Sequence, residues 1–485
     1  MTRGDPADRS GDTGRRHVGA GTGLIFGWGR GRSTGRLADS AAVTTRHSAS
    51  LYPWQIGSTL PAAGPVLGLD VLAGRTVFHY DPWELYARRV VTSPNMVVLG
   101  QLGKGKSALV KTYLHRQLLS GRQAFVLDPK GEYAALAALH RIPLLRLAPG
   151  SPDRLNPLDP HPGDTPEQIL RRRAGTVAAL AGTGLGRELL PEERAGLTAA
   201  LAGLDRTAVL GDVVHRLLEP TPEMAFSLST STERLAGAIR PVALELHRLL
   251  SGDLAGLVDA PTTARLALDG PGLVLDLSAA FGTAALPAVM VCAGAWLSST
   301  LTPHHHEPAA RSSDRAGSDT GGDRAFADSG TGGGAGTRQR LLLVDEAWAL
   351  LHLPATTSWL QGISKFARAH GISLITVLHR VSDLTGQADT GTATQAQARG
   401  LLADAETRVL YTQTAGERAL LRELLGLTGP ELDLVTQLPP HRALWQIGRH
   451  AAVVDHLLSP LEAQRLVDTD QRMRRTAPSA AAVQR

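Results

Sequence analysis

One eight-residue segment limits the fold of this 485-residue chain more than any other feature. It fits the pattern G-x-x-x-x-G-K-[ST] and consists of Gly100, Gln101, Leu102, Gly103, Lys104, Gly105, Lys106 and Ser107. An apolar segment, NMVVL, precedes it, and a helical pattern, SALVKTYLHRQLL, follows it. Glycines let backbone N–H groups curl around phosphates, and the start of the helix adds a positive dipole end. The sequence therefore predicts a phosphate-binding loop between a strand and a helix.

Each part of this loop has an expected task. Lys106 is expected to reach the β- and γ-phosphates of ATP and to assist catalysis, and Ser107 to offer its hydroxyl to Mg²⁺. The whole nucleotide-binding set is predicted to be Gly100, Gln101, Leu102, Gly103, Lys104, Gly105, Lys106, Ser107 and Ala108.

A second motif lies further along the chain, where the apolar run Leu341-Leu342-Leu343-Val344 ends in Asp345 and Glu346. An apolar strand that ends in two acids is the Walker B pattern. Asp345 is expected to hold Mg²⁺, directly or through water, and Glu346 to polarise the attacking water. Downstream of a phosphate-binding loop in one chain, the motif predicts ATP hydrolysis.

Short apolar runs alternate with helical patterns along most of the chain. The predicted strands cover 95–99, 123–127, 273–277, 341–344, 372–378 and 407–411. They are apolar on both faces, which is typical of a parallel sheet covered by helices on both sides. Residues 442–447 and 451–456 predict a hairpin at the edge of that sheet.

Residues 165–258 depart from this pattern, with Leu and Ala at helical spacing and no convincing strand, and predict a helical subdomain inserted in the α/β core. The expected division is a core in three parts (49–164, 263–301 and 339–467), the helical insertion (165–262), disordered segments (1–48 and 302–338) and a frayed tail (468–485). His304, His305 and His306 are interpreted as part of a solvated loop, because no other group of ligand-type residues frames them.

Composition excludes several classes of protein. The single cysteine, Cys292, excludes a disulfide scaffold and a multi-cysteine metal site, and no run is long and apolar enough for a membrane span. The net charge of +5 is weak for this length and does not by itself indicate nucleic-acid binding. These features favour a soluble cytoplasmic protein.

Lysine is rare, and four of the five lysines fall within 104–130, which favours a site that needs compact ammonium groups.

A third motif, Asp128-Pro129-Lys130-Gly131-Glu132-Tyr133, directly follows a predicted strand. With the phosphate loop, Asn156-Pro157-Leu158, the end of the helical insert at 251–259, VLDLS at 274–278 and VDEAW at 344–348, it resembles the TraC-type ATPases of conjugative DNA transfer and type IV secretion. These belong to the HerA–FtsK superfamily of P-loop NTPases. The block YDPWELY at 80–86 is also similar to the lead-in of such ATPases, and the resemblance covers about residues 51–462.

This resemblance implies an α/β fold with a RecA-like P-loop ATPase core, a homo-hexamer, ATP and Mg²⁺ as cofactors, and work on a macromolecule. It implies that His379, at the end of the predicted strand 372–378, is a sensor of the γ-phosphate or the attacking water, where relatives often carry Gln; a structural histidine is the alternative. It also nominates Arg368 as an arginine finger for a neighbouring subunit. The alternatives are a solvated helix face that Arg368 shares with Lys365, or that role for Arg408, Arg442 or Arg449; Asp276 is interpreted as a structural acid.

Three functions compete at this point. The first is a motor or assembly ATPase of a conjugative-transfer or type IV secretion-like apparatus, with the apparatus proteins as partners and a peripheral position at the inner face of the cell membrane. The second is a HerA/FtsK-like ATPase that translocates DNA. The third is a nucleotide-binding scaffold with little hydrolysis, against which Glu346 argues. No helix-turn-helix, zinc finger or aromatic–basic strip separates protein from DNA as the moved substrate.

Overall fold

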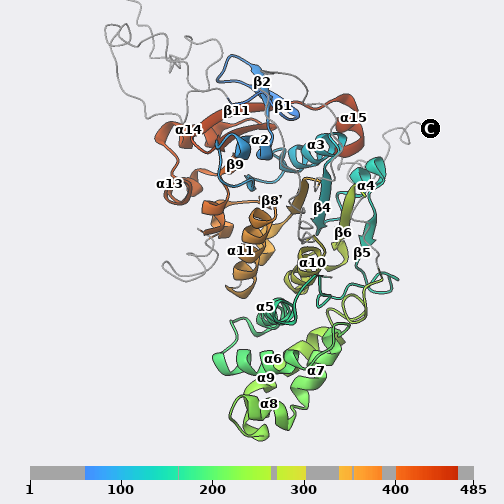
Figure 1. Cartoon of the computed structure of the whole chain (residues 1–485). Coiled ribbons are helices and arrows are strands. Elements are labelled where there is room, and N and C mark those ends of the chain that lie inside the picture. The colour runs from blue at the N-terminus through green and yellow to red at the C-terminus, as the bar shows by residue number, and fades with distance from the viewer. Residues whose placement is uncertain are drawn as a thin grey trace, which may run out of the picture.

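The computed structural model describes residues 60–161, 163–263, 270–301, 338–351, 354–384 and 400–467. These residues form an α/β protein around one mostly parallel sheet, so the predicted fold class is confirmed (Figure 1). The segments predicted to be disordered, 1–48 and 302–338, and the predicted tail 468–485 lie outside the described residues apart from Arg338, and so do the three consecutive histidines.

The sheet has eleven strands in the order β2-β1-β11-β10-β9-β3-β8-β7-β4-β6-β5. Neighbouring strands from β9 to β5 are parallel, and those from β2 to β9 are antiparallel. The strands are β1 (Val66–Asp70), β2 (Thr76–His79), β3 (Met96–Leu99), β4 (Gln123–Asp128), β5 (Leu144–Arg146), β6 (Gly272–Asp276), β7 (Arg340–Val344), β8 (Ile372–Leu378), β9 (Thr407–Leu410), β10 (Arg442–Ile447) and β11 (His450–His456).

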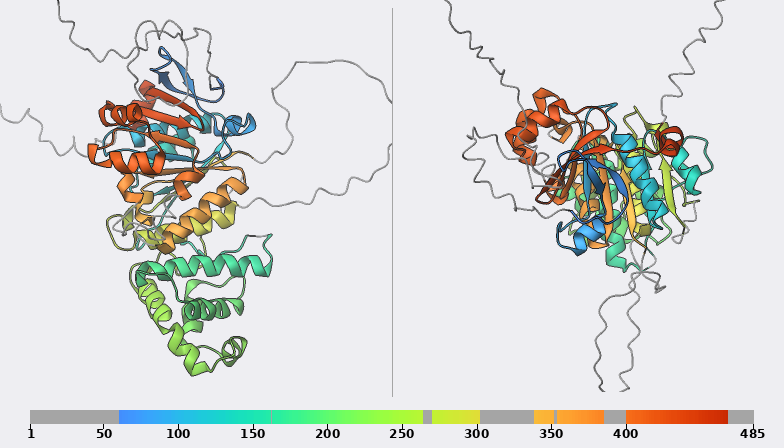
Figure 2. Two further views of the ribbon diagram at one scale, coloured as in Figure 1. Left: turned by 90° about the vertical axis from the view of Figure 1, so that its left-hand side faces the viewer. Right: turned by 90° about the horizontal axis from the view of Figure 1, so that it is seen from above.

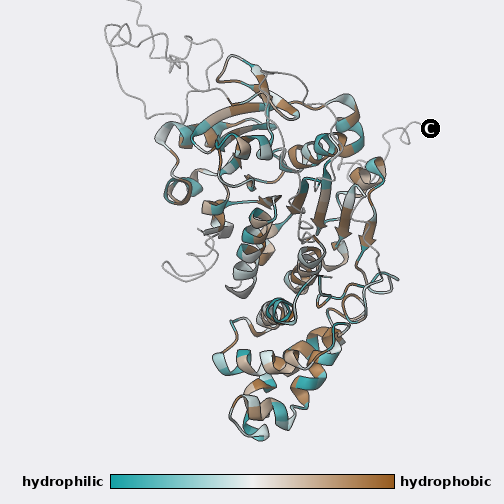
Figure 3. Ribbon diagram, in the orientation of Figure 1, coloured by the Kyte–Doolittle hydropathy of each residue, from teal (hydrophilic) through white to brown (hydrophobic). Residues whose placement is uncertain are grey.

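The central parallel strands β3, β4 and β8 are buried on both faces, which explains their largely apolar sequences (Figure 3). In β3, Val97 and Leu99 belong to the hydrophobic core on one face, whereas Met96 and Val98 belong to the core on the other. This alternation follows from the two-residue period of a strand. Helices therefore have to cover both sides of this part of the sheet.

The six predicted parallel-type strands agree with the observed strands to within one residue at each end. Three strands were not predicted. β5 has only three residues with an exposed–buried–exposed pattern, and β1 and β2 lack a continuous apolar run. The predicted hairpin forms, but its expected position at the sheet edge is wrong. β1 pairs with β11, with Gly68 opposite His456, and β2 lies beyond β1.

Helices α3 (Lys106–Leu119) and α4 (Ala134–His140) contribute to the core on one face, and α10 (Leu286–Leu301) and α11 (Pro354–Ala369) to the core on the other. The remaining helices near the sheet are short. They are α2 (Pro82–Ala87), α13 (Arg418–Leu425), α14 (Gly429–Gln437) and α15 (Pro460–Glu462), which runs into a π-helical turn at Ala463–Val467.

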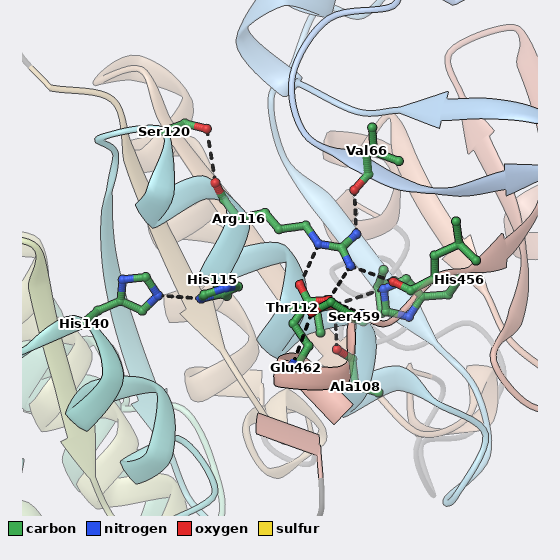
Figure 4. Close-up of polar contacts among 12 residues, drawn as sticks. Val66, Ala108, Thr112, His115, Arg116, Ser120, His140, His456, Ser459 and Glu462 are labelled. Atoms are coloured by element: carbon green, nitrogen blue, oxygen red, sulfur yellow. Dashed lines mark hydrogen bonds and ion pairs between the residues drawn. The ribbon is translucent and has the colours of Figure 1, made fainter. Parts of the chain in front are cut away.

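Helix α3 is tied to both ends of the described chain (Figure 4). The Arg116 guanidinium donates to both carboxylate oxygens of Glu462, each at 2.7 Å, and to the carbonyl oxygens of Val66 and Leu457 at 2.5 and 2.6 Å. Glu462 lies in α15, whose first turn is capped by Ser459. The helix that begins at the phosphate loop is therefore tied to β1 and to the segment that follows β11.

Residues 163–263 contain no strand among those described. Their helices are α5 (Pro166–Leu185), α6 (Pro191–Ala202), α7 (Leu210–Leu218), α8 (Pro222–Ser227) and α9 (Thr232–Ser251). Leu235, Ile239, Val242, Leu246 and Leu249 form the buried stripe of α9, with the three- and four-residue spacing of an amphipathic helix. The helices lie together on one side of the sheet, as Figure 2 shows, and α5 makes the contacts with α10 and α11.

Candidate nucleotide site

The predicted phosphate loop lies between the end of β3 and the start of α3, as expected. Gly100, Gly103 and Gly105 have φ values of 159°, 73° and 108°, a region that favours glycine. A Cβ on Gly100 would lie 2.4 Å from the Cβ of Tyr411, so a larger residue does not fit there. The glycines thus give the loop both its curvature and its close approach to β9.

The Lys106 side chain is buried at the mouth of this loop. Its ammonium group donates to the carbonyl oxygen of Gln101 at 2.9 Å and to that of Gly100. Ser107 and Ala108 occupy the first turn of α3, where backbone N–H groups lack helical partners. An ammonium group and a helix N-terminus at one loop are suited to an anion.

The loop also has a support that the sequence motif does not contain. The backbone N–H of His441 donates to the Lys104 carbonyl oxygen at 3.0 Å, and the Gln101 N–H donates to the Thr412 carbonyl oxygen at 3.2 Å. His441 has a φ of 65°, in the left-handed region. These contacts come from segments more than 300 residues away, so no local pattern indicated them.

Asp345 follows β7, and its side chain is fully buried by its surroundings. Its Oδ1 accepts the Glu346 N–H at 2.9 Å, and its Oδ2 accepts the Tyr133 hydroxyl at 3.0 Å. Burial, with the nearby Glu346 carboxylate, raises the pKa of Asp345 to about 6, although the Tyr133 and backbone hydrogen bonds oppose the rise. A buried carboxylate of this kind favours a cation as a partner.

Glu346 has a left-handed backbone, with a φ of 52°, and its carboxylate is held by three donors. Oε1 lies 2.5 Å from the Lys130 ammonium nitrogen, and Oε2 lies 2.6 Å from His379 Nε2 and also accepts the Trp348 indole N–H. Burial raises the pKa of Glu346, but the hydrogen bonds from His379, Lys130 and Trp348 outweigh it and lower the pKa to about 2. The carboxylate is therefore ionised near neutral pH.

His379 lies directly after β8, which runs between β3 and β7 in the sheet. Its contact with Glu346 brings it beside the acid that is predicted to polarise the attacking water. Its Nδ1 is buried and has no hydrogen-bond partner among the described residues. The carboxyl ends of three adjacent strands thus carry the phosphate loop, His379, and the pair Asp345 and Glu346.

The block at 128–133 lies beside these residues and contacts both acids. The Asp128 carboxylate accepts the backbone N–H groups of Lys130, Glu132 and Tyr133 at 3.2, 3.1 and 2.9 Å, which shapes the turn after β4. Burial raises the pKa of Asp128 to about 6 against the effect of these bonds. Glu132 pairs with Lys111 of α3 at 2.9 Å. In the sequence this block indicated a family, and its Lys130 belonged to the group of lysines that favoured a site with ammonium groups, but its contacts with Asp345 and Glu346 were missed.

The candidate arginine fingers fall into two groups. Arg408 donates to backbone carbonyls of its own chain, and Arg442 forms a two-bond ion pair with Asp455 at 2.9 and 3.0 Å. Arg368 and Arg449 are exposed. Arg368 precedes the amino end of β8 and Arg449 lies in the turn after β10, so both are at the sheet edge opposite the phosphate loop. Lys365 is exposed on the same helix as Arg368.

Asp276, at the end of β6, accepts the Ser278 N–H at 2.9 Å and lies 3.8 Å from the Arg146 guanidinium. These contacts agree with a structural acid. A cavity of about 440 Å³ lies elsewhere, between α5, α10 and α11, where Arg172, Trp359 and Phe366 are among its lining residues. None of the phosphate-loop residues lines it.

Some known protein structures are similar to this chain. No protein-family model and no curated protein matches the chain. The solved structure of VirB4 from Thermoanaerobacter pseudethanolicus does, with a TM-score of 0.63 at 20% sequence identity, over 84% of this chain and 99% of that one. The chain has the VirB4 fold. The structural similarity that the motifs indicated is thereby confirmed.

The plasmid coupling protein TrwB is also similar. Its structure with a non-hydrolysable ATP analogue has a TM-score of 0.53 at 16% identity, over 77% of this chain and 87% of that one. Its structure with ADP and Mg²⁺ has a TM-score of 0.51 at 15% identity, over 75% and 86%. At such identities the likeness is one of fold. Within the described ranges, no helix is long and apolar enough to cross a membrane.

Proposed function

We propose that this chain is an ATP-binding and ATP-hydrolysing motor or assembly ATPase of a conjugative-transfer or type IV secretion-like apparatus. One observation carries the proposal. The phosphate loop, His379, and the acids Asp345 and Glu346 lie at the carboxyl ends of the adjacent strands β3, β8 and β7. Ligands of parallel α/β sheets typically bind at this edge.

The residues of the loop fit ATP with Mg²⁺. Residues 100–108 would bind the phosphates, with the Lys106 ammonium exchanging its carbonyl partners for phosphate oxygens, and Ser107 and Asp345 would hold the metal. Asp345 has accepted only one hydrogen bond on each oxygen, so each oxygen retains an acceptor site. Bound Mg²⁺-ATP would supply a γ-phosphoryl group that transfers to water.

Glu346 would orient and polarise that water, because it is ionised and lies next to the metal-binding acid. His379 would fix the Glu346 carboxylate through the 2.6 Å contact and act as the sensor. An intact glutamate held in this way argues against a scaffold with little hydrolysis.

The same proposal includes assembly. A homo-hexamer would let Arg368 of one subunit reach the nucleotide of the next, since Arg368 is exposed and lies at the sheet edge opposite its own phosphate loop. The helical segment would form an insertion subdomain, 165–262, within the core parts 49–164, 263–301 and 339–467. A peripheral position at the inner face of the membrane, with apparatus proteins as partners, would follow from this role.

The wider structural match favours the apparatus role over DNA translocation. The VirB4 structure covers more of the chain, at a higher TM-score, than the TrwB coupling-protein structures do. The similarity to TrwB, a plasmid coupling protein, keeps a DNA-translocating ATPase as the second candidate.

The test is ATP hydrolysis by the purified full chain, measured with Mg²⁺, with Mg²⁺ and single-stranded DNA, and with Mg²⁺ and double-stranded DNA. We expect Mg²⁺-dependent hydrolysis that Glu346→Gln removes while ATP binding remains. Strong stimulation by DNA would favour the translocating candidate. Absence of hydrolysis in every arm, with ATP still bound, would leave the scaffold and refute the proposal.

A further inference from the structure

The segment after β4 makes contacts that the proposed ATPase site does not yet use. Lys130 and Tyr133 belong to one turn, and each reaches a different acid of the next strand in the sheet, β7. Lys130 contacts Glu346, and Tyr133 contacts Asp345. Among the described residues, these two pairings are the side-chain contacts between this turn and the two acids.

The contacts on Glu346 leave one direction for a further donor. A carboxylate offers about four lone-pair sites, two on each oxygen. On Oε2 both are used, by His379 and Trp348, whereas on Oε1 only one is used, by Lys130. A water bound by Glu346 therefore has to approach Oε1, beside the Lys130 ammonium group.

The contact on Asp345 has a similar effect. Tyr133 is fully buried, and its hydroxyl donates to Oδ2, while the Glu346 N–H donates to Oδ1. With both oxygens held by one donor each, the plane of the carboxylate is fixed. One lone pair on each oxygen remains for a cation or its water.

The turn that carries both residues is itself rigid. Asp128 accepts three of its backbone N–H groups, and Gly131 has a φ of 68°, where a Cβ would also approach the Ser278 side chain at 3.2 Å. The Lys130 ammonium lies 5.6 Å from the centre of the Phe281 ring, a weak contact beside the 2.5 Å pair. Lys130 thus starts from a fixed backbone and ends on Glu346.

We propose that Lys130 and Tyr133 are positioning residues of the nucleotide site, Lys130 for Glu346 and Tyr133 for Asp345. The inference rests on the proposed function, because it assigns these residues to the same reaction. Lys130 holds Oε1 of Glu346, the oxygen that His379 and Trp348 leave open to the water, and Tyr133 sets the orientation in which Asp345 meets Mg²⁺. A lysine suits the first task, because its compact ammonium occupies one lone pair, whereas a guanidinium fork would span both oxygens.

The first experiment does not depend on catalysis. Trp348 donates to Oε2 of Glu346, so its fluorescence reports how firmly that carboxylate is held. The Trp348 signal is the difference between each protein and the same protein with Trp348→Phe. Lys130→Met should change this difference spectrum, and Lys130→Arg should change it less. The matched control is Arg187→Met, which removes a cation from the equally buried Glu193 in the helical segment and should leave the signal unchanged.

The second experiment separates binding from turnover. Lys130→Met should lower kcat about 100-fold, as expected for a misplaced catalytic group, and leave the Kd for ATP close to the parental value. Lys130→Arg should recover part of the loss. Tyr133→Phe should raise the Mg²⁺ concentration for half-maximal rate about tenfold, because it removes a partner of a metal ligand. Its control is Tyr113→Phe, since the buried Tyr113 hydroxyl has no hydrogen-bond partner among the described residues.

The outcomes separate the two levels of the argument. If the parental chain binds but never hydrolyses ATP, the proposed function fails, and a changed Trp348 signal in Lys130→Met still supports positioning. If the parental chain hydrolyses ATP and Lys130→Met keeps both its kcat and its Trp348 signal, the role of Lys130 is refuted. A Tyr133→Phe protein with parental Mg²⁺ dependence refutes the role of Tyr133. Unfolding midpoints confirm that each variant is folded.

Discussion

Buried charges occur both at the carboxyl edge of the parallel strands and in the helical segment α5 to α9, but they are satisfied differently. In the helical segment, Arg173 donates to the carbonyl oxygens of Leu158, Asp205 and Arg206, at 2.9, 2.8 and 2.6 Å. Glu193 there accepts two bonds from Arg187 and one from a backbone N–H. At the strand ends, Asp345 accepts only the Tyr133 hydroxyl and a backbone N–H, so neither of its hydrogen-bond partners carries a charge.

This difference distinguishes structural from functional buried charge better than burial alone does. A buried charge that the fold itself pairs with a countercharge or with carbonyl oxygens stabilises the fold, and its removal leaves the partner groups unpaired. A buried carboxylate without a charged partner, held rigid by its neighbours, is prepared for a cation from outside the chain. Changes in the two regions should therefore have separable effects on turnover and on stability.

The largest effect should come from the strand-end region. Lys106→Ala should remove ATP binding, because it deletes the ammonium group that is buried in the phosphate loop. Glu346→Gln should keep binding and lower turnover by at least about 100-fold, within the range for a lost general base. Equilibrium binding of a fluorescent ATP analogue and the steady-state rate measure the two effects. A Glu346→Gln protein with the parental rate would show that another residue polarises the water.

These residues could be predicted because each motif is local. Each motif is one short contiguous segment: the loop at 100–107, the strand 372–378 and the acids that follow 341–344. The strand ends of a parallel sheet share one edge, so these segments could be expected to meet. Their supports could not be predicted, because they depend on tertiary pairing. His441 meets Lys104 only when β10 folds beside β9, and Lys130 meets Glu346 only when β4 pairs with β7.

The edge of the sheet shows the same limit. The hairpin of β10 and β11 follows from two apolar runs around Gly448, but its neighbour β1 is nearly 400 residues away in sequence. β1 has a glycine at its centre, and β2 exposes Val77. Neither strand has a period that indicates burial, so the sequence did not indicate what covers β11.

The next effect tests whether the strand-end site is complete within one chain. Arg368→Ala should keep ATP affinity and lower turnover by orders of magnitude, as loss of an arginine finger does. Mixing Arg368→Ala with Lys106→Ala protein should restore part of the rate, because mixed boundaries pair an intact loop with an intact arginine. The measurement is the rate of the mixture against each protein alone. An unchanged rate for Arg368→Ala would move the role to the exposed Arg449 before Arg408 or Arg442, which are bonded within their own chain.

A smaller effect, on stability rather than rate, is expected in the helical segment. Arg173→Ala leaves three carbonyl oxygens without their donor and should lower the free energy of unfolding by about 2–3 kcal/mol. The control is Arg171→Ala, an exposed neighbour on α5, which should change it by less than about 0.5 kcal/mol. Denaturant unfolding measures both. An Arg173→Ala protein of parental stability that fails to hydrolyse ATP would contradict the division between the two regions.

The smallest effect is expected at His456, a histidine of β11 that contacts Thr112 of α3 and is uncharged near neutral pH. His456 is neutral near pH 7, because burial, with the nearby Arg116 guanidinium and with His441, lowers its pKa to about 3. Glu462 opposes this shift. Its Nε2 lies 2.9 Å from the Thr112 hydroxyl, which donates to the Ala108 carbonyl, so Nε2 is the donor (Figure 4). A second proton on the buried Nδ1 would find no acceptor among the described residues.

The pH dependence of stability follows from this shift. In the unfolded chain the pKa returns to about 6.5, so below that value the unfolded state binds one proton more than the folded state. Stability should therefore fall as pH decreases from about 6.5 towards 3, with His456 contributing up to about 1.4 kcal/mol per pH unit. His456→Gln can still donate to Thr112 but does not titrate, so its stability should fall less steeply over pH 7 to 5. His247→Gln, an exposed change on α9, should keep the parental slope. Equal slopes for all three proteins would show that His456 is not held neutral. The contact between Thr112 of α3 and His456 of β11 would then accommodate a charge, as the helical segment accommodates that of Arg173.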